Sequence, residues 1–136
     1  MLNPQDCMCE DIRRTARALT SAYEAALKPV GLTVGQFTLL SLLKGMGPMP
    51  LSALAEHADL DRTTLSRNLT PLTRRGLVET QATEDRRVKS MILTASGRDL
   101  HSEALPLWRE AQSRYLARLG EPVARNLQTL TAQLRD

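Results

Sequence analysis

Residues 50 to 94 read PLSALAEHADLDRTTLSRNLTPLTRRGLVETQATEDRRVKSMILT. The beginning of this stretch has apolar residues at i, i+3, i+4 and i+7, the spacing of one face of a short helix. These residues are Leu51, Leu54, Ala55 and Ala58. Asp61 stands at the N-cap position of a second helix, where its carboxylate can accept hydrogen bonds from free backbone N–H groups. We expect this second helix to run from about Arg62 to Arg75 and to end at Gly76.

The second helix has one apolar face and one polar face. Leu65, Leu69 and Leu72 recur at i, i+4 and i+7 and are expected to hold it to the core. The opposite face has short polar and guanidinium side chains, the types that reach base edges and phosphates in a DNA major groove. The candidate DNA-binding residues of this helix are Arg62, Thr63, Thr64, Ser66, Arg67, Asn68 and Thr70.

Two short strands are expected next, at residues 77–81 and 88–94, with a polar hairpin tip between them. A two-stranded ribbon with arginines at its tip suits a minor groove, where the narrow walls concentrate negative potential. The candidate contacts here are Arg86, Arg87 and Lys89. A solvated basic face on an ordinary helical core is the usual meaning of a basic run alone. Here a helix, a turn, a capped helix and a basic ribbon follow in order, which predicts a winged helix-turn-helix that binds double-stranded DNA.

The charge of the chain supports this prediction. Residues 62–98 contain eight basic and three acidic residues, an excess of +5, whereas the whole chain has a net charge of +3. The basic charge is therefore concentrated where DNA contact is expected. A length of 136 residues indicates one domain.

Other classes of function find little support in the sequence. There is no apolar run of roughly 18 residues and no apolar signal segment, so we expect no membrane association and a cytoplasmic location. No Ser/His/Asp constellation, glycine-rich phosphate loop or metal-ligand cluster is visible, so neither an enzyme nor a metal or cofactor is expected. The alternatives are a non-specific, nucleoid-type DNA-binding protein and, with less support, a thiol redox enzyme using Cys7 and Cys9.

Helices are expected on both sides of the central stretch. The first spans about residues 6–28, and the next begins with a Thr33–Gln36 capping box and ends near Gly45. After the ribbon, Thr94 is expected to cap a long helix to about Leu119, and a last helix follows Gly120. The apolar edge of that last helix is nearly a coiled-coil seam, made of Val123, Leu127, Leu130 and Leu134.

One short chain cannot easily bury the outer faces of these terminal helices against its own central region. We therefore expect a homodimer in which they intertwine, and the alternative is that they complete a monomeric helical shell. A two-fold dimer would hold two recognition helices about one DNA turn apart, roughly 34 Å, and would bind a pseudo-palindrome.

Four segments of the chain together resemble the MarR family of bacterial transcriptional regulators. They are LTVGQF at Leu32–Phe37, the helix at Leu51–Glu56, RRGLVE at Arg74–Glu79 and DRRVKSMILTASG at Asp85–Gly97. The most specific is D-x-R followed by L-T-x-x-G after a wing, and the resemblance covers nearly the whole chain.

The resemblance implies a mainly α fold with a small β-ribbon in a single domain, residues 1–136. Residues 1–31 and 98–136 would form dimerisation helices, and residues 32–97 the winged helix-turn-helix. It also implies a repressor, with Arg87 as the arginine that enters the minor groove and Asp85 supporting the wing by pairing with a neighbouring arginine.

Two kinds of signal are consistent with the sequence. In the organic-hydroperoxide-sensing branch of this family a reactive cysteine lies near the start of the first helix, and Cys9 resembles it, with Cys7 beside it and Tyr23 as its partner tyrosine. A thiol at a helix N-terminus can have a lowered pKa. The alternative signal is a small aromatic or phenolic ligand in a cleft between the terminal helices and the wing domain. The candidate lining residues are Tyr23, Phe37, Met46 and Trp108, each of which could instead be ordinary core.

Overall fold

The computed structural model of the chain describes residues 3 and 6–135. The helices are α1 (Met8–Leu27), the 3-10 helix η2 (Lys28–Val30), α2 (Val34–Met46), α3 (Leu51–Ala58), α4 (Arg62–Arg74), α5 (Ala95–Leu119) and α6 (Glu121–Leu134). The strands are β1 (Met49–Pro50), β2 (Val78–Ala82) and β3 (Lys89–Leu93). The mainly helical fold is as predicted from the sequence, and the predicted helices and strands follow one another in the expected order; η2 and β1 were not predicted.

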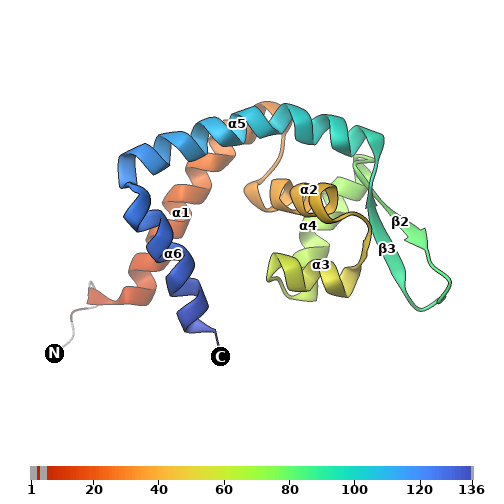
Figure 1. The fold of residues 1–136 in the computed structure, drawn as a ribbon, viewed down its shortest axis with the longest axis horizontal. Coiled ribbons are helices and arrows are strands. Elements are labelled where there is room, and N and C mark those ends of the chain that lie inside the picture. The colour runs from red at the N-terminus through yellow and green to blue at the C-terminus, as the bar shows by residue number, and fades with distance from the viewer. Residues whose placement is uncertain (1–2, 4–5, 136) are drawn as a thin grey trace.

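The molecule is an arch (Figure 1). Helix α5 forms its top and joins two parts that lie on either side of an opening. One part, which we call the lobe, contains α2, α3, α4 and the sheet, residues 34–93. The other part, which we call the arm, contains α1 and α6. The arm meets the lobe again at the base of the arch, where the Arg135 guanidinium pairs with the carboxylate of Asp59.

The sheet has three strands, not the two expected from the sequence. Its order is β1-β3-β2 and both pairings are antiparallel, with Met49 opposite Met91 and Val78 opposite Leu93. The additional strand, β1, has only two residues and ends in Pro50, which cannot donate a ladder hydrogen bond. Proline is tolerated here because β1 lies at the edge of the sheet.

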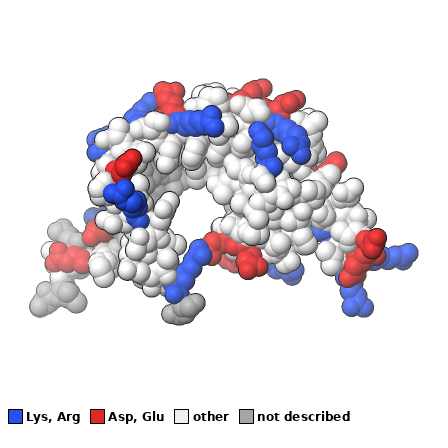
Figure 2. All heavy atoms as spheres, in the orientation of Figure 1, with Lys and Arg blue, Asp and Glu red and all other residues white. Residues whose placement is uncertain are grey.

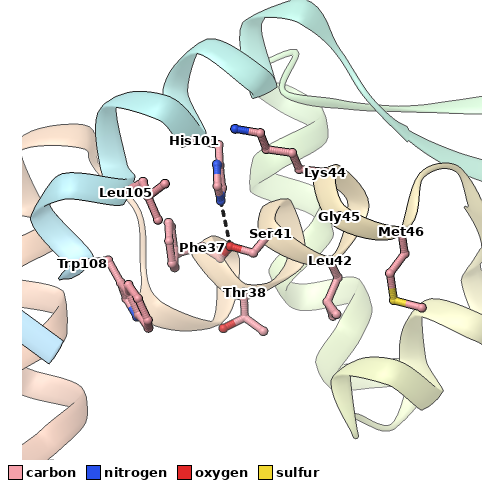
Figure 3. Close-up of a pocket in the computed structure, with 10 residues that line it drawn as sticks. All are labelled: Phe37, Thr38, Ser41, Leu42, Lys44, Gly45, Met46, His101, Leu105 and Trp108. Carbon is pink, nitrogen blue, oxygen red and sulfur yellow. Dashed lines mark hydrogen bonds between the residues drawn. The ribbon is translucent and has the colours of Figure 1, made fainter. Parts of the chain in front are cut away.

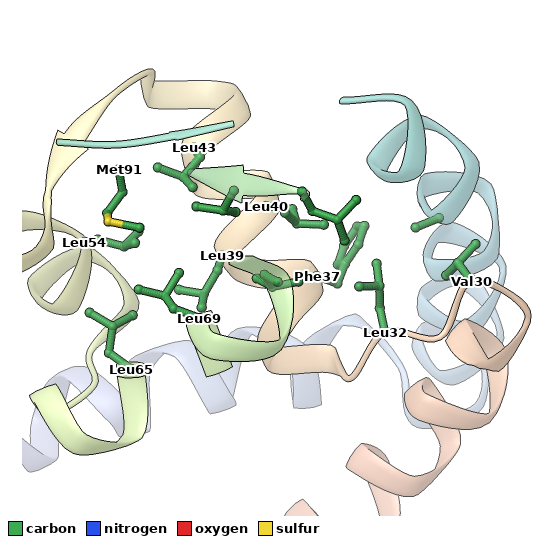
Figure 4. Packing of buried hydrophobic residues seen from close by; sticks show 14 of the residues in the cluster. Val30, Leu32, Phe37, Leu39, Leu40, Leu43, Leu54, Leu65, Leu69 and Met91 are labelled. Carbon is green, nitrogen blue, oxygen red and sulfur yellow. The ribbon is translucent and has the colours of Figure 1, made fainter. Parts of the chain in front are cut away.

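The core of the lobe is made of leucines from its three helices (Figure 4). The fully buried side chains include Leu39 and Leu40 of α2, Leu54 of α3 and Leu65 of α4. Leu69 and Leu72 are also buried, so the three leucines predicted to attach α4 to the core do so. The face of α4 that remains exposed is thereby fixed relative to the sheet.

The predicted caps are present. The Thr33 hydroxyl accepts from the Gln36 backbone N–H, and the Gln36 side chain accepts from the Thr33 N–H, which completes the capping box. The Thr94 hydroxyl accepts from the Gly97 N–H at 3.0 Å and donates to the carbonyl of Gly76. Thr94 therefore joins the start of α5 to the turn that follows α4.

In the described part of the chain no single helix is long and apolar enough to cross a membrane. The segments Met8–Val30 and Val34–Met46, bent by 69° at the break between them, meet the criteria of length and composition only as a pair.

Candidate nucleic-acid interface

Helix α4 begins at a well-formed cap. The Asp61 carboxylate accepts a hydrogen bond of 2.7 Å from the Thr64 backbone N–H. Hydrogen bonding from Thr64, assisted by the nearby Arg67 guanidinium, lowers the pKa of Asp61. The cap is thus an anion at neutral pH, stabilised by the positive end of the helix dipole.

The exposed face of α4 contains five of the seven residues of this helix that were predicted to bind DNA. These five surround one shallow depression on the surface: Arg62, Thr63, Ser66, Arg67 and Thr70. They follow the helical period, so their side chains leave the same side of the helix, opposite Leu65 and Leu69. Two guanidinium groups and three hydroxyl groups on one convex helix are suited to base edges and phosphates in a major groove.

Two predicted residues do not belong to this exposed face. Thr64 and Asn68 are half-buried on the flank of α4. The Asn68 amide lies against Gly35 of α2, close enough that a Cβ on Gly35 would be 3.5 Å from its nitrogen and oxygen atoms. From the sequence, Asn68 was predicted to lie beside the polar face of α4. In the structure its side chain lies against α2 instead.

A groove between α4 and the sheet extends the exposed face toward the wing, which is the hairpin formed by β2, β3 and the turn between them. It has a volume of about 400 Å³ and is lined by Leu51, Ser66, Leu69, Thr70, Thr73, Arg74, Thr80, Lys89 and Met91. Lys89 was predicted from the sequence to bind DNA, whereas Arg74 was not. Arg74 follows Thr70 by one helical turn, so the two residues lie on the same face of α4. This spacing could have predicted that Arg74 belongs to the DNA-binding face.

The wing tip is held by hydrogen bonds within the turn. The Thr83 hydroxyl donates to the Val88 carbonyl at 2.7 Å, and the Val88 N–H donates to the Asp85 carbonyl at 3.0 Å. The Asp85 carboxylate accepts from the Arg87 backbone N–H at 3.0 Å. Asp85 therefore supports the tip through the backbone; among the described residues it makes no ion pair with an arginine, contrary to the expectation from the sequence.

Arg86 and Arg87 are both exposed at this tip. In the space-filling view the end of the wing projects from the lobe and carries basic and acidic side chains together (Figure 2). The turn thus presents two guanidinium groups on a backbone whose geometry Asp85 and Thr83 fix. Such a projection has the shape needed to enter a minor groove while α4 occupies the adjacent major groove.

Within a single chain, Tyr23 lies far from the two cysteines with which it was predicted to form a redox site. Cys7 and Cys9 are exposed free thiols at the start of α1. Tyr23 lies fourteen positions after Cys9 on the same helix, about 21 Å away at 1.5 Å per residue. The Tyr23 hydroxyl instead donates to Gln112 of α5, and its ring stacks on Tyr115. Burial, and then the proximity of Tyr115, raise the pKa of Tyr23.

The predicted ligand residues are brought together, with one exception. Phe37, Met46 and Trp108 line a groove between α2 and α5 (Figure 3), which has a volume of about 660 Å³. Tyr23 lies outside it, in the arm. The sequence did not predict the other lining residues, which are Thr38, Ser41, Leu42, Lys44, Gly45, His101 and Leu105.

The wall of this groove is an aromatic stack with a polar pair beside it. The Phe37 ring lies parallel to the His101 ring at 5.1 Å and stacks on Trp108 at 5.8 Å. The His101 Nε2 and the Ser41 hydroxyl are 2.9 Å apart and hydrogen-bonded (Figure 3). His101 is buried, and its Nδ1 has no hydrogen-bond partner among the described residues. Burial, and then the charge of Lys44, lower the pKa of His101, so its ring is neutral at neutral pH.

The chain is similar to known transcriptional regulators along most of its length. The model of a family described as the MarR family matches residues 32–89. An HTH-type transcriptional repressor of Mycobacterium tuberculosis, Rv2887, is 32% identical over 122 residues, which cover 89% of this chain and 88% of the relative.

Solved structures show the same similarity. The structure of the M. tuberculosis transcriptional regulator MosR in complex with DNA is 41% identical with a TM-score of 0.83, covering 92% of this chain and 93% of MosR. The structure of BpsR from Bordetella bronchiseptica is 21% identical with a TM-score of 0.87, covering 100% and 99%, and indicates a shared fold.

Proposed function

The chain belongs to the MarR family and is a DNA-binding transcriptional regulator, and from this premise we propose that it is a homodimeric repressor of a pseudo-palindromic operator. The observation that supports the proposal is the pair of depressions on α4 that share Ser66 and Thr70 and extend from Arg62, near the capped N-terminus, to Arg74 and Lys89. Lys89 begins β3, the strand that follows the exposed wing tip with Arg87. The relative that is 32% identical is named a transcriptional repressor, which supports repression rather than activation.

The proposed roles follow the positions of the side chains. The exposed residues of α4, from Arg62 to Thr70, read base edges in the major groove. Arg74 and Lys89 bind the phosphates between the two grooves, and Arg87, beside Arg86, enters the minor groove. Residues 32–97 are then the DNA-reading part of the single domain, and residues 1–31 and 98–136 hold two copies together.

The dimer is proposed from the exposed apolar residues of the arm. Four side chains on α6 are both apolar and exposed, namely Val123, Leu127, Leu130 and Leu134, and Ile12 of α1 is exposed as well. They repeat at the helical period along one edge of α6, which is the pattern of a helix that packs against another helix. A second copy of the chain is the partner that makes two recognition helices available to a pseudo-palindrome.

The groove at Phe37 is the proposed effector site. Its aromatic and aliphatic walls suit a small aromatic ring, while Ser41 and the Lys44 ammonium group offer a hydrogen bond and a positive charge to a hydroxyl or carboxylate on that ring. The groove lies between α2 of the lobe and α5, which leads to the arm. A ligand that fits one angle between these helices better than another shifts the population toward that angle and away from the DNA-binding form.

Oxidation of Cys9 is the second proposed signal, favoured by the exposure of both thiols at the start of α1. An organic hydroperoxide would oxidise the thiolate to a sulfenic acid and be reduced to the alcohol; the sulfenic acid would then condense with a thiol, releasing water and forming a disulfide. On a regular helix, Cys7 and Cys9 point to different sides, so a bridge between them requires the first turn of α1 to unwind.

The experiment that tests the proposal begins with selection of a binding duplex from a random-sequence library by the reduced protein. A pseudo-palindrome bound far more tightly than random duplex supports the proposed repressor. Equal affinity for both, falling with salt, would instead indicate a non-specific nucleoid-type protein.

The same duplex then separates the two signals in a gel shift. Loss of binding with organic hydroperoxide, recovery with dithiothreitol and no response in Cys9→Ser identify the thiol signal. Release by small aromatic acids that is lost in Ser41→Ala identifies the groove. Multiple turnovers of hydroperoxide by the isolated protein would indicate a thiol redox enzyme.

A further inference from the structure

The end of α4 is attached to the turn between α1 and α2 by one side chain, Arg75. Its Nη1 donates to the carbonyl of Gly31 at 2.8 Å, and its Nη2 donates to the carbonyl of Val30 at 3.0 Å. A guanidinium that spans two successive carbonyl oxygens holds both position and direction, because its donors are fixed in one plane. Arg75 is the C-cap residue of α4, so this fork acts on the last point of the helix.

The two acceptors lie where the arm turns into the lobe. Helix α1 is followed directly by η2, and the chain bends by 69° before α2 begins. Gly31 has a φ of 65° in this bend, a conformation that glycine adopts without strain. Val30 is buried in the same cluster as Leu32 (Figure 4), so the packed side chains on both sides fix the position of these carbonyls.

Arg74 and Arg75 are adjacent, have the same charge and face different parts of the molecule. Arg74 lines the groove between α4 and the wing, together with Lys89. Arg75 extends in another direction, to the turn after η2. A contact with DNA phosphate is therefore available to Arg74 from the proposed interface, while both terminal nitrogens of Arg75 donate to carbonyls within the protein.

We propose that Arg75 is a positioning residue for DNA recognition, which fixes the orientation of α4 relative to the turn after α1 and so links the arm to the DNA-binding face of α4. This inference rests on the proposed sequence-specific binding. The link is separate from the one through α5, where Thr94 contacts the carbonyl of Gly76. With both links intact, α4 moves together with the arm as one rigid body. Without the Arg75 fork, the C-terminal end of α4 is free to tilt relative to the turn after η2.

The test compares Arg75→Ala, Arg75→Lys and Arg74→Ala, using the duplex selected by the unaltered protein and a random duplex. Binding is measured over a range of salt concentrations, and each active fraction is found by stoichiometric titration. Arg75→Ala is expected to lower affinity for the selected duplex about tenfold, to leave the random duplex unaffected and to leave the salt slope unchanged, because only a phosphate contact adds to that slope. Arg74→Ala is expected to weaken both duplexes and to reduce the salt slope by about 0.9.

Arg75→Lys decides whether charge or the fork matters. Lysine keeps the charge but cannot bridge two carbonyls in one plane, so this variant is expected to remain impaired on the selected duplex. It also serves if Arg75→Ala does not fold. Full affinity in Arg75→Lys, a reduced salt slope in Arg75→Ala, or an unchanged ratio of selected to random binding in both variants would each overturn the proposal.

The proposed function fails in a different way. If the unaltered protein selects no sequence, both the repressor and the positioning role are refuted. If it selects a sequence that Arg75→Ala binds as tightly, only the role of Arg75 is refuted.

Discussion

Arg87 has an exposed side chain on a backbone held by Asp85, which makes it the side chain best placed to be tested alone. Arg87→Ala is expected to weaken binding to all duplexes about tenfold, roughly 1.4 kcal/mol, and more where A·T-rich flanks narrow the minor groove. Fluorescence anisotropy with A·T-rich and G·C-rich flanks measures both effects. Arg118→Ala removes the same charge from an exposed position near the end of α5, next to the arm. Equal losses of affinity in the two variants would show that net charge, not the wing contact, matters.

His101 is expected to make stability depend on pH. Because burial, and then Lys44, lower its pKa in the folded protein, the unfolded chain takes up a proton at higher pH than the folded one. The contribution of the neutral ring to stability is therefore fully present above the ordinary histidine pKa of about 6.5 and is lost as the pH falls toward the lowered pKa. Urea unfolding at several pH values below neutrality measures it.

The matched variants for this prediction are His101→Gln and His57→Gln, since the chain has two histidines. His101→Gln keeps a polar group beside Ser41 but does not titrate, so its free energy of unfolding should fall less as the solution is acidified. His57 is exposed on α3, and its variant should follow the unaltered protein. If both variants show the same pH dependence as the unaltered protein, burial of His101 does not control it.

At the scale of elements, the contact between α5 and the sheet depends on a glycine. A Cβ at Gly97 would lie 2.2 Å from the Leu77 carbonyl oxygen and 2.6 Å from a methyl group of Leu93. Because the closest atom is backbone, relief requires α5 to move away from the sheet. Gly97→Ala is therefore expected to destabilise the protein by at least about 1–3 kcal/mol, measured by urea unfolding.

The same substitution at Gly45 is expected to have the opposite effect on stability. It also lies in a helix, but apart from its chain neighbours and the backbone of its own helix no atom of the described residues is within 4 Å of a Cβ built there. Gly45→Ala should stabilise the protein by about 0.5–1 kcal/mol, because alanine loses less backbone entropy than glycine on folding. A Gly97→Ala variant as stable as Gly45→Ala would contradict the close approach of α5 to the sheet.

Elements with a local signal were predictable from the sequence. The caps at Thr33, Asp61 and Thr94 fixed the starts of three helices within a residue, because a cap is made by neighbours in the chain. Strand β1 was missed because two residues ending in Pro50 have no periodicity; pairing with β3 creates the strand.

The candidate site was predictable only in part, for a related reason. Periodicity gave the exposed face of α4, but it did not show that Asn68 turns toward Gly35 of α2. The hydrogen bond between Ser41 and His101 joins residues sixty positions apart, so no local pattern could predict it. The Asp85 carboxylate likewise had several neighbours available, and the backbone of the turn decided which one it binds.

At the scale of the whole molecule, the arch leaves the arm with an apolar surface that one chain does not cover. Leu130 is 38% exposed and Leu127 is 43% exposed, unlike the leucines of the lobe core. The Tyr23–Gln112 contact and the stack on Tyr115 fix α1 against α5 beneath this surface. The contacts of Tyr23 therefore hold α1 against α5 within one chain, and the apolar edge of α6 remains exposed, where the proposed second copy would bind.

Leu130→Glu tests whether this edge holds the proposed dimer. A carboxylate in an interface between helices would have to be buried without a partner, so the variant is expected to sediment as a monomer in analytical ultracentrifugation. Ala132→Glu adds the same charge to the opposite face of α6, two positions away, and should leave the dimer intact. A monomer has one recognition helix for one half-site, so Leu130→Glu should also lose the preference for a pseudo-palindrome while retaining salt-dependent binding to random duplex. If Leu130→Glu remains a dimer while Ala132→Glu dissociates, the interface lies on the other face of α6; if both remain dimers with unchanged operator binding, α6 does not hold the two copies together.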